Sequence, residues 1–232
     1  MHKPPSNHPT TSPTRVWDLP TRLFHWSLLV CVVGLVISGN VGGNWMVWHF
    51  RLGYAVLTLL LFRIVWGLIG GRWSRFSSFI YAPSSIVAYI KGRGKPEHSV
   101  GHNPLGAGSV FALLGFLLFQ VLTGLVSDDE ISNQGPLNKF VTGARASLAT
   151  WYHKEVGNKI LIALVVLHIA AIAFYTIKKK EQLIGPMLHG YKLLPASVPA
   201  AASRDDAASR SVAALVLAVC AGVVWWVVSL GN

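Results

Sequence analysis

The chain has 232 residues, of which 52% are hydrophobic and only 12% are charged. A soluble domain is about 25% charged, so the composition argues against an ordinary soluble enzyme. Nine Trp, ten Phe and six Tyr supply ample surface to bury, which excludes a disordered chain. The net charge of +11 indicates contact with nucleic acid or with a membrane face, and the hydrophobicity favours the membrane.

Residues 1–14 contain four prolines and are predicted to be a disordered tail. The rest of the chain holds five apolar runs that are long enough, or nearly so, to cross about 30 Å of hydrocarbon as helices. These runs are residues 23–38, 47–69, 105–126, 147–177 and 212–230. The first run also fits a signal peptide, but no clear small-x-small cleavage site follows it, which favours a span.

The expected fold is all-α: an integral membrane four-helix bundle plus one additional transmembrane helix. The bundle is assigned to residues 15–193. Residues 194–211, rich in Ala, Ser and Pro, are predicted to be a flexible linker. Residues 212–230 carry neither His nor charge, and this fifth helix is expected to serve as an anchor or packing helix.

The Lys and Arg residues predict the orientation of the spans. Most of the twenty lie before the first run, between the second and third, or after the fourth. By the positive-inside rule, the amino terminus is cytoplasmic and the carboxyl terminus is periplasmic, in a bacterial inner membrane. Because this topology gathers the basic residues on one side, they do not indicate a nucleic-acid partner.

Four of the nine histidines lie within the runs or at their ends: His25, His49, His153 and His168. Ionisable groups at membrane depth are costly and usually functional, although a single one can be a helix–helix hydrogen-bonding residue. His153 and His168 are about 22 Å apart along one helix and differ by about 60° in direction, so they share a face at two depths. Paired imidazoles across a bundle can ligate haem iron, which predicts two bis-histidine haem b groups: His49 with His153 outside, and His25 with His168 inside.

Two other chemistries fit the histidines less well. A zinc or di-metal site would require clustered ligands, usually with carboxylates or thiolates. A proton relay remains open, although relays normally include Asp or Glu at depth.

Two glycines and two arginines support the haem hypothesis. Gly53 and Gly157 each follow an outer histidine by four residues and would let a flat macrocycle approach, although tight helix packing explains them equally well. Arg63 lies about 21 Å deeper than His49 on nearly the same face, which suggests a haem propionate as its partner or snorkelling to the headgroups. Arg51 would serve the outer propionates or mark the membrane interface.

The remaining histidines of the basic loop, His98 and His102, are expected to be solvated. The acidic turn after the third run, which holds Asp128, Asp129 and Glu130, would supply proton acceptors for quinol or simply be solvated.

Several segments together resemble one family. They are VWDLPTRLFHW, HFRLGY followed by FRIVWG, HNPLGA, GPL and WYHKEVGNKILIALVVLH, in order over residues 15–180. This set is similar to the prokaryotic cytochrome b561 family, which includes the b-type cytochrome subunits of nickel-iron hydrogenases. The resemblance implies a four-helix bundle that holds two b haems by histidines on helices 1, 2 and 4, which here are His25, His49, His153 and His168.

The expected function is transmembrane electron transfer. The resemblance implies exchange of electrons between membrane quinone or quinol and a periplasmic redox partner such as a c-type cytochrome. The opening segment is most similar to members that accompany small haem c proteins. The alternative is a haem-bearing membrane anchor subunit of a larger, hydrogenase-like respiratory complex. A small transporter would bind no haem.

Overall fold

A computed structural model of the chain describes residues 11–129, 133–198 and 200–231. Five helices of this part are long and apolar enough to cross a membrane. They are Leu19–Val41, Gly43–Ile69, Pro104–Val126, Gly143–Ile177 and Ala207–Ser229. The predicted all-α membrane fold is therefore confirmed.

The elements follow one another along the chain as helices joined by short turns. The strands are β1 (Thr11–Arg15) and β2 (Tyr191–Pro195). The α-helices are α1 (Leu19–Val41), α2 (Met46–Ile69), α3 (Pro83–Ile90), α4 (Pro104–Val126), α5 (Gly143–Trp151), α6 (Asn158–Ile177), α7 (Ile184–His189) and α8 (Ala207–Ser229). A π-helix, Tyr152–Gly157, joins α5 to α6, and 3₁₀ turns lie at Gly43–Trp45, Phe76–Ser78, Pro96–Ser99 and Asn138–Phe140.

Capping residues explain why three spans begin where they do. The side chain of Asp18 accepts a hydrogen bond from Thr21 N, so α1 begins four residues before the apolar run. Asn103 caps α4 in the same way, with Pro104 in the first turn. Asp206 caps α8, which begins five residues earlier than the predicted fifth helix.

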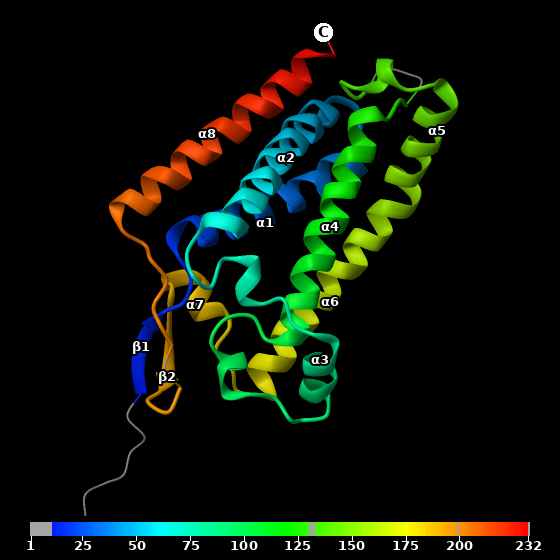
Figure 1. Cartoon of the computed structure of the whole chain (residues 1–232). Helices are drawn as coiled ribbons and strands as arrows, with labels where there is room; N and C mark the ends of the chain where they lie inside the picture. Colours follow the sequence, from blue (N-terminus) through cyan, green and yellow to red (C-terminus); the bar gives the residue numbers. More distant parts are fainter. Residues whose placement is uncertain (1–10, 130–132, 199, 232) are drawn as a thin grey trace, which may run out of the picture.

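The core of the bundle lies between α1, α2, α4 and α6. It is built from Val32, Val56, Leu60, Leu117 and Leu161, all buried. α8 packs on α2 on the side away from α5 and α6, where Cys220 and Ala213 meet Phe62 and Trp66 (Figure 1). Large apolar side chains on the outer faces stay exposed, as a lipid-facing surface requires.

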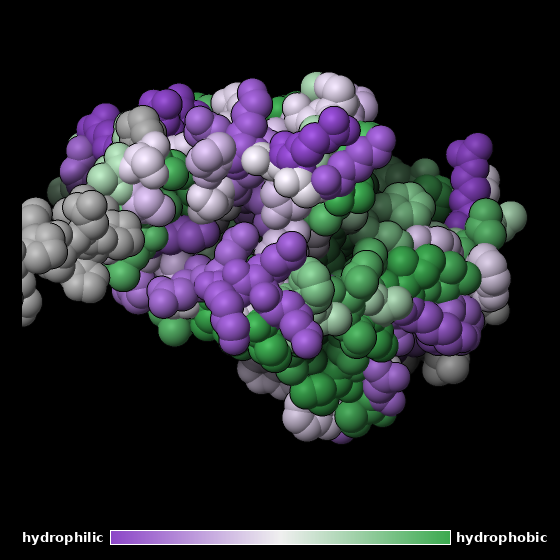
Figure 2. Space-filling model, turned by 90° about the horizontal axis from the view of Figure 1, so that it is seen from below, coloured by the Kyte–Doolittle hydropathy of each residue, from purple (hydrophilic) through white to green (hydrophobic). Residues whose placement is uncertain are grey.

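The two ends of the bundle differ. One end, called the cap end below, carries β1, β2, α3 and α7. The far end carries residues 127–129 and 133–142 and the end of α8 (Figure 1). Seen from the cap end, the surface shows hydrophilic side chains over much of the face, with apolar ones beside them (Figure 2). The exposed cations of the cap-end segments include Arg72, Arg75, Lys91, Arg93, Lys95, Lys178, Lys179 and Lys180.

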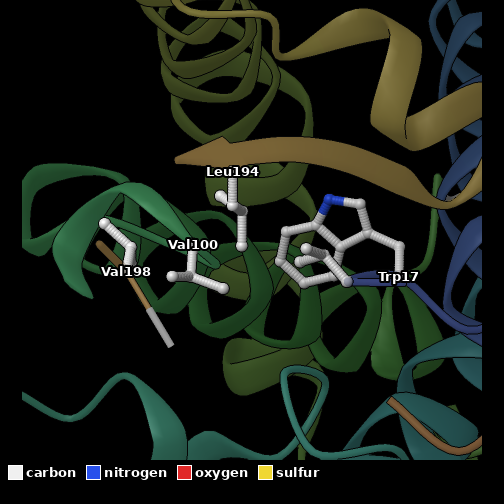
Figure 3. Close-up of a cluster of buried hydrophobic side chains, with 5 residues drawn as sticks. Trp17, Val100, Leu194 and Val198 are labelled. Atoms are coloured by element: carbon white, nitrogen blue, oxygen red, sulfur yellow. The ribbon is translucent and has the colours of Figure 1, made fainter. Parts of the chain in front are cut away.

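The cap end is held by segments that are far apart in the chain. β1 pairs with β2 in antiparallel register, Thr11 opposite Pro195 and Arg15 opposite Tyr191. Figure 3 shows the small core beneath this pair, in which Trp17, Val100, Leu194 and Val198 point toward one another. The four side chains come from the segment after β1, the loop before α4, β2 and the segment that follows β2.

This small core corrects two predicted boundaries. Residues 11–14 were predicted to belong to a disordered tail, but they form β1 because β2 supplies the hydrogen-bonding partner; residues 1–10 lie outside the described part. The predicted linker, 194–211, is shorter in the structure, because its first residues belong to β2 and its last residues belong to α8. Between them, Ser203 Oγ donates to Val16 O at 2.7 Å, and Trp73 Nε1 donates to Ala201 O at 2.9 Å, so this segment packs on the cap end.

Candidate functional site

Two of the predicted ligands, His49 and His153, face each other at the far end of the bundle. His49 lies in the first turn of α2, and His153 lies in the π-helix. Their ring centroids are 6.0 Å apart and the rings are nearly perpendicular, at 86°. Since a metal–imidazole bond is about 2 Å long, this separation suits one metal ion between the two rings.

The hydrogen bonds of the His49 and His153 rings leave Nε2 free on both. His49 Nδ1 lies 3.1 Å from Leu35 O, and His153 Nδ1 lies 2.9 Å from Gln120 O. A carbonyl partner makes Nδ1 the protonated nitrogen and leaves Nε2 as the lone-pair donor. Both rings therefore have the tautomer that a metal ligand needs.

The π-helix positions His153. Its wider turns insert one residue into the span, as π-bulges at functional sites often do. Gln120 of α4 donates from Nε2 to His153 O at 2.9 Å, and Thr123 Oγ1 lies 3.2 Å from His153 Nδ1. α4, which has no histidine of its own, thus fixes both the backbone and the ring of this residue.

A cavity of about 460 Å³ adjoins the pair and is lined by both histidines. A methyl group added at Gly39 or Gly124 would lie 3.0 Å from Cε1 of His49 or His153, respectively, so these glycines let the rings seat closely. Neither was among the predicted site residues, because each lies on a different helix from the ring that it contacts.

The two predicted cradle glycines differ from each other. Gly53 lines the cavity, and a methyl group there would meet nothing within 4 Å, which suits the approach of a flat group. At Gly157 the methyl group would lie 1.9 Å from Gln120 Oε1. In the structure, Gly157 therefore gives space to Gln120, which is the helix-packing alternative.

The second predicted pair lies nearer the cap end. His25 is in α1 and His168 is in α6. Ser109 Oγ, from α4, lies 3.4 Å from His168 Nδ1. The Nδ1 atom of His25 is buried without a hydrogen-bond partner. Both histidines interact electrostatically with His102, so the fold brings the three together.

Arg63 is buried beside this group, with 3% of its surface exposed. Its guanidinium carbon lies 4.6 Å from the centre of the Phe76 ring, and its Nη1 has no hydrogen-bond partner. Such burial argues against snorkelling and leaves a donor for an anionic ligand. Arg51 differs, since it is exposed and lies 5.2 Å from the Trp48 ring, an arrangement typical of the membrane interface.

His102 was predicted to be solvated, and this prediction is wrong. Its ring lies between Trp17 and Phe79, with centroid distances of 4.7 and 4.5 Å, and its Nδ1 is buried without a partner. Burial, followed by the charge of Arg63, lowers the pKa of His102 to about 3, so the ring is neutral at pH 7. The available sequence signal was its place just before the Asn103 cap, where the chain is fixed against the bundle.

Asp18 is a second residue that the sequence analysis missed. It is fully buried and, besides capping α1, accepts from Trp66 Nε1, Gly71 N and Ser74 Oγ. It thereby joins the start of α1 to the end of α2 next to Arg63. The sequence signal for a buried Asp18 was its position in WDLP, between a Trp and a Leu-Pro pair.

The donor set is suited to haem. Among the described residues, no group of three or more His, Cys, Asp or Glu side chains gathers to hold a metal ion. A macrocycle that brings four ligands of its own needs only a pair of imidazoles. The free Nε2 atoms of the far-end pair fit the iron of one such group, and the unpartnered Arg63 Nη1 fits a carboxylate of a second group nearer the cap end.

The acidic turn, by contrast, is engaged with its own residues. Asp128 Oδ2 accepts from Gln134 Nε2 at 3.0 Å, and Asp129 accepts from both the backbone and the side chain of Asn133. Glu130 lies outside the described residues. The turn is therefore built as a local loop.

Comparisons with known proteins identify a family for the chain. A family model described as prokaryotic cytochrome b561 matches residues 16–190. A probable Ni/Fe-hydrogenase 1 B-type cytochrome subunit of Escherichia coli strain K12 is 24% identical over 212 residues, covering 76% of this chain and 89% of the relative. Similar subunits from Cupriavidus necator and Bradyrhizobium diazoefficiens are 23% and 25% identical, covering 77% and 75% of this chain and 86% and 84% of the relatives. No solved structure matches the chain at a significant level.

Proposed function

The chain belongs to the prokaryotic cytochrome b561 family, and from this premise we propose that it carries electrons across the membrane through two b haems. The coarser function, electron transfer by a membrane protein with haem b, follows from the family itself. The proposal adds the number of haems, their ligands and their partners. The observation that carries it is the facing pair His49 and His153, each with Nδ1 on a backbone carbonyl and Nε2 free.

The far-end haem would be held by His49 and His153 in the cavity that Gly53 lines. The cap-end haem would be held by His25 and His168, with Arg63 binding a propionate. Each bound haem supplies one-electron chemistry between ferric and ferrous iron, and two of them at different depths give a path for single electrons. The residues of this chain fix the tautomers, hold the carboxylates and keep water away from the rings.

We assign the cap end to the cytoplasm and the far end to the periplasm. The cations exposed at the cap end support this topology by the positive-inside rule, and the described carboxyl terminus lies at the opposite end (Figure 1). Two reporters fused to the carboxyl terminus test this topology. A reporter that is active only in the periplasm should be active, and one that is active only in the cytoplasm should be inactive. Activity of the cytoplasmic reporter would contradict the assignment.

The proposed electron path joins membrane quinone or quinol to a periplasmic redox protein such as a c-type cytochrome. The test is reduction of the purified chain by a soluble quinol analogue, followed by haem absorbance. Wild type should be reduced, whereas a His49→Ala, His168→Ala double variant should lose the response. Absence of reduction of the fully loaded wild type would contradict the independent carrier.

A second candidate is a haem-bearing anchor subunit of a larger oxidoreductase. The names of the relatives, B-type cytochrome subunits of Ni/Fe-hydrogenases, favour it. This candidate predicts that the chain leaves the membrane in mild detergent as a stable complex with a catalytic subunit, and that the complex reduces the haems when it receives its own substrate. A chain that is extracted alone and is reduced directly by quinol would contradict it.

A further inference from the structure

We propose that His102 is a second donor, beside Arg63, for the anionic carboxylate arms of the macrocycle at the cap-end site. The inference rests on the proposed function, because it takes that site to hold haem. His102 lies in a loop outside the spans, and neither the spacing of the four predicted ligands nor the helix periodicity indicates a role for it.

The position of His102 is fixed from several directions. Its ring is enclosed by Trp17 and Phe79. Its carbonyl oxygen accepts a hydrogen bond of 2.7 Å from the Tyr81 hydroxyl, and the next residue, Asn103, caps α4 through Gly106 N at 2.8 Å. A ring held in this way is preorganised to bind, since little side-chain entropy remains to be lost.

Three buried nitrogen atoms in this region lack partners: His25 Nδ1, His102 Nδ1 and Arg63 Nη1. His25 is one of the proposed iron ligands, which leaves His102 and Arg63. Phe79 contacts the His102 ring and also Phe76, and the Arg63 guanidinium lies over the Phe76 ring. A buried polar atom without a partner costs about 1–3 kcal/mol. One large ligand that reaches both atoms would satisfy the two.

The missing partner must be an acceptor with negative charge. The neighbouring acid is Asp18, but its oxygens already accept from Thr21 N, Trp66 Nε1, Gly71 N and Ser74 Oγ. Haem b carries two propionate groups, so one guanidinium and one neutral imidazole N–H match its carboxylates in number, and the guanidinium offsets one of their two negative charges. A free anion such as phosphate offers the same oxygens, and the experiment must separate the two.

A donor to a propionate also has a redox consequence. The negative charge of the carboxylate favours the ferric state of the iron, and a hydrogen bond draws part of that charge away. Loss of the donor therefore lowers the midpoint potential of the cap-end haem alone. It also weakens haem retention at that site by about tenfold, the effect of one hydrogen bond to a charged group.

The test compares three variants of the full chain, purified in detergent with haem bound. His102→Phe keeps an aromatic ring between Trp17 and Phe79 but removes the donor. His102→Asn restores an amide N–H near the place of Nδ1. His98→Asn is the matched control from the same loop, because His98 Nδ1 already accepts from Lys95 N at 3.2 Å.

The readouts are haem per chain, the low-spin electron paramagnetic resonance signals and potentiometric titration of each haem. We expect His102→Phe to lower the potential and the retention of one haem, His102→Asn to restore most of both, and His98→Asn to match wild type. Unchanged potentials and haem content in His102→Phe would overturn the proposal. Conversion of the retained haem from a low-spin to a high-spin signal in His102→Phe would also overturn it, because His102 would then be an axial ligand.

Two further measurements separate the explanations. If the wild-type potential shifts between phosphate and chloride buffers and the shift disappears in His102→Phe, the site binds a free anion and the proposal fails. Failure of the proposed function itself has a different signature, namely a wild-type chain with fewer than two haems whose spectrum is unaffected by His168→Ala.

Discussion

Replacement of Gly157 by alanine tests whether this glycine serves the protein or the macrocycle. The added methyl group would lie 1.9 Å from Oε1 and 2.7 Å from Cδ of Gln120. To relieve this contact, Gln120 must turn away, and it then loses its 2.9 Å hydrogen bond to His153 O. Overpacking costs about 1–3 kcal/mol and the lost bond about 1 kcal/mol, while alanine returns up to about 1 kcal/mol of helix propensity.

The expected net destabilisation by Gly157→Ala is about 2 kcal/mol, which lowers the melting temperature by about 4–8 °C for a chain of this size. The assay is thermal unfolding of the purified chain in detergent, followed by circular dichroism. Gly53→Ala is the matched control, since Gly53 bears the same relation to His49 as Gly157 bears to His153 but faces open space. It should leave the melting temperature equal or higher and lower only the far-end haem content.

A double-mutant cycle with Gln120→Ala makes the test decisive. In that background the clash is absent, so Gly157→Ala should be neutral or slightly stabilising. An equal loss of stability from Gly157→Ala in both backgrounds would show that the new methyl group does not act through Gln120. No loss in either background would show the same.

Three more predictions follow from the contacts at the two ends of the bundle. Gly39→Ala should tilt the His49 ring, 3.0 Å from the new methyl group, and shift the potential of one haem in potentiometric titration; a wild-type potential would contradict this. Asp18→Ala leaves four buried donors without an acceptor and should cost about 3 kcal/mol or more in thermal unfolding. The exposed cap variant Asp206→Ala should cost clearly less; equal costs would show that the buried network adds nothing. Burial raises the pKa of Asp205, but its hydrogen bond and ion pairs with two arginines lower the pKa more, to below the usual value. A depressed folded pKa means that the stabilisation is present above the pKa of the unfolded carboxyl, about 3.9, and is lost as the pH falls through the folded value. Asp205→Asn should therefore speed hydrogen exchange of β1 at pH 7, whereas wild type should reach that rate only in acid. Equal exchange of variant and wild type at pH 7 would show that the ion pairs of Asp205 do not stabilise β1.

The spans and the far-end pair could be predicted from the sequence because they depend on local properties. Apolar runs of sufficient length identify helices in any context. The 100° turn per residue is enough to place His153 and His168 on one face, and His49 was assigned opposite His153 from the order of the spans. The structure brings this last pair to 6.0 Å between ring centroids.

The cap end could not be predicted in the same way, because its order depends on contacts between distant segments. Thr11–Arg15 forms a strand only because Tyr191–Pro195 lies beside it. His102 looks solvated among basic residues, but contact with Trp17 and Phe79 leaves its ring half-buried and its Nδ1 fully buried.

The roles of the two glycines also depend on contacts between segments that are distant in the sequence. The positions of Gly53 and Gly157 relative to their histidines are identical in sequence, yet one faces a cavity and the other faces Gln120. The difference arises from α4, whose side chains have no fixed sequence relation to α2 or to the π-helix.

The central claim is that four histidines hold two haems at two levels of one bundle. Its most direct test is the haem-to-chain ratio of the purified protein, measured with a reduced-minus-oxidised difference spectrum in wild type, His49→Ala and His168→Ala. We expect two haems in wild type and one in each variant, with different haems lost from the two variants. Two haems with unchanged reduced spectra in either variant would contradict it.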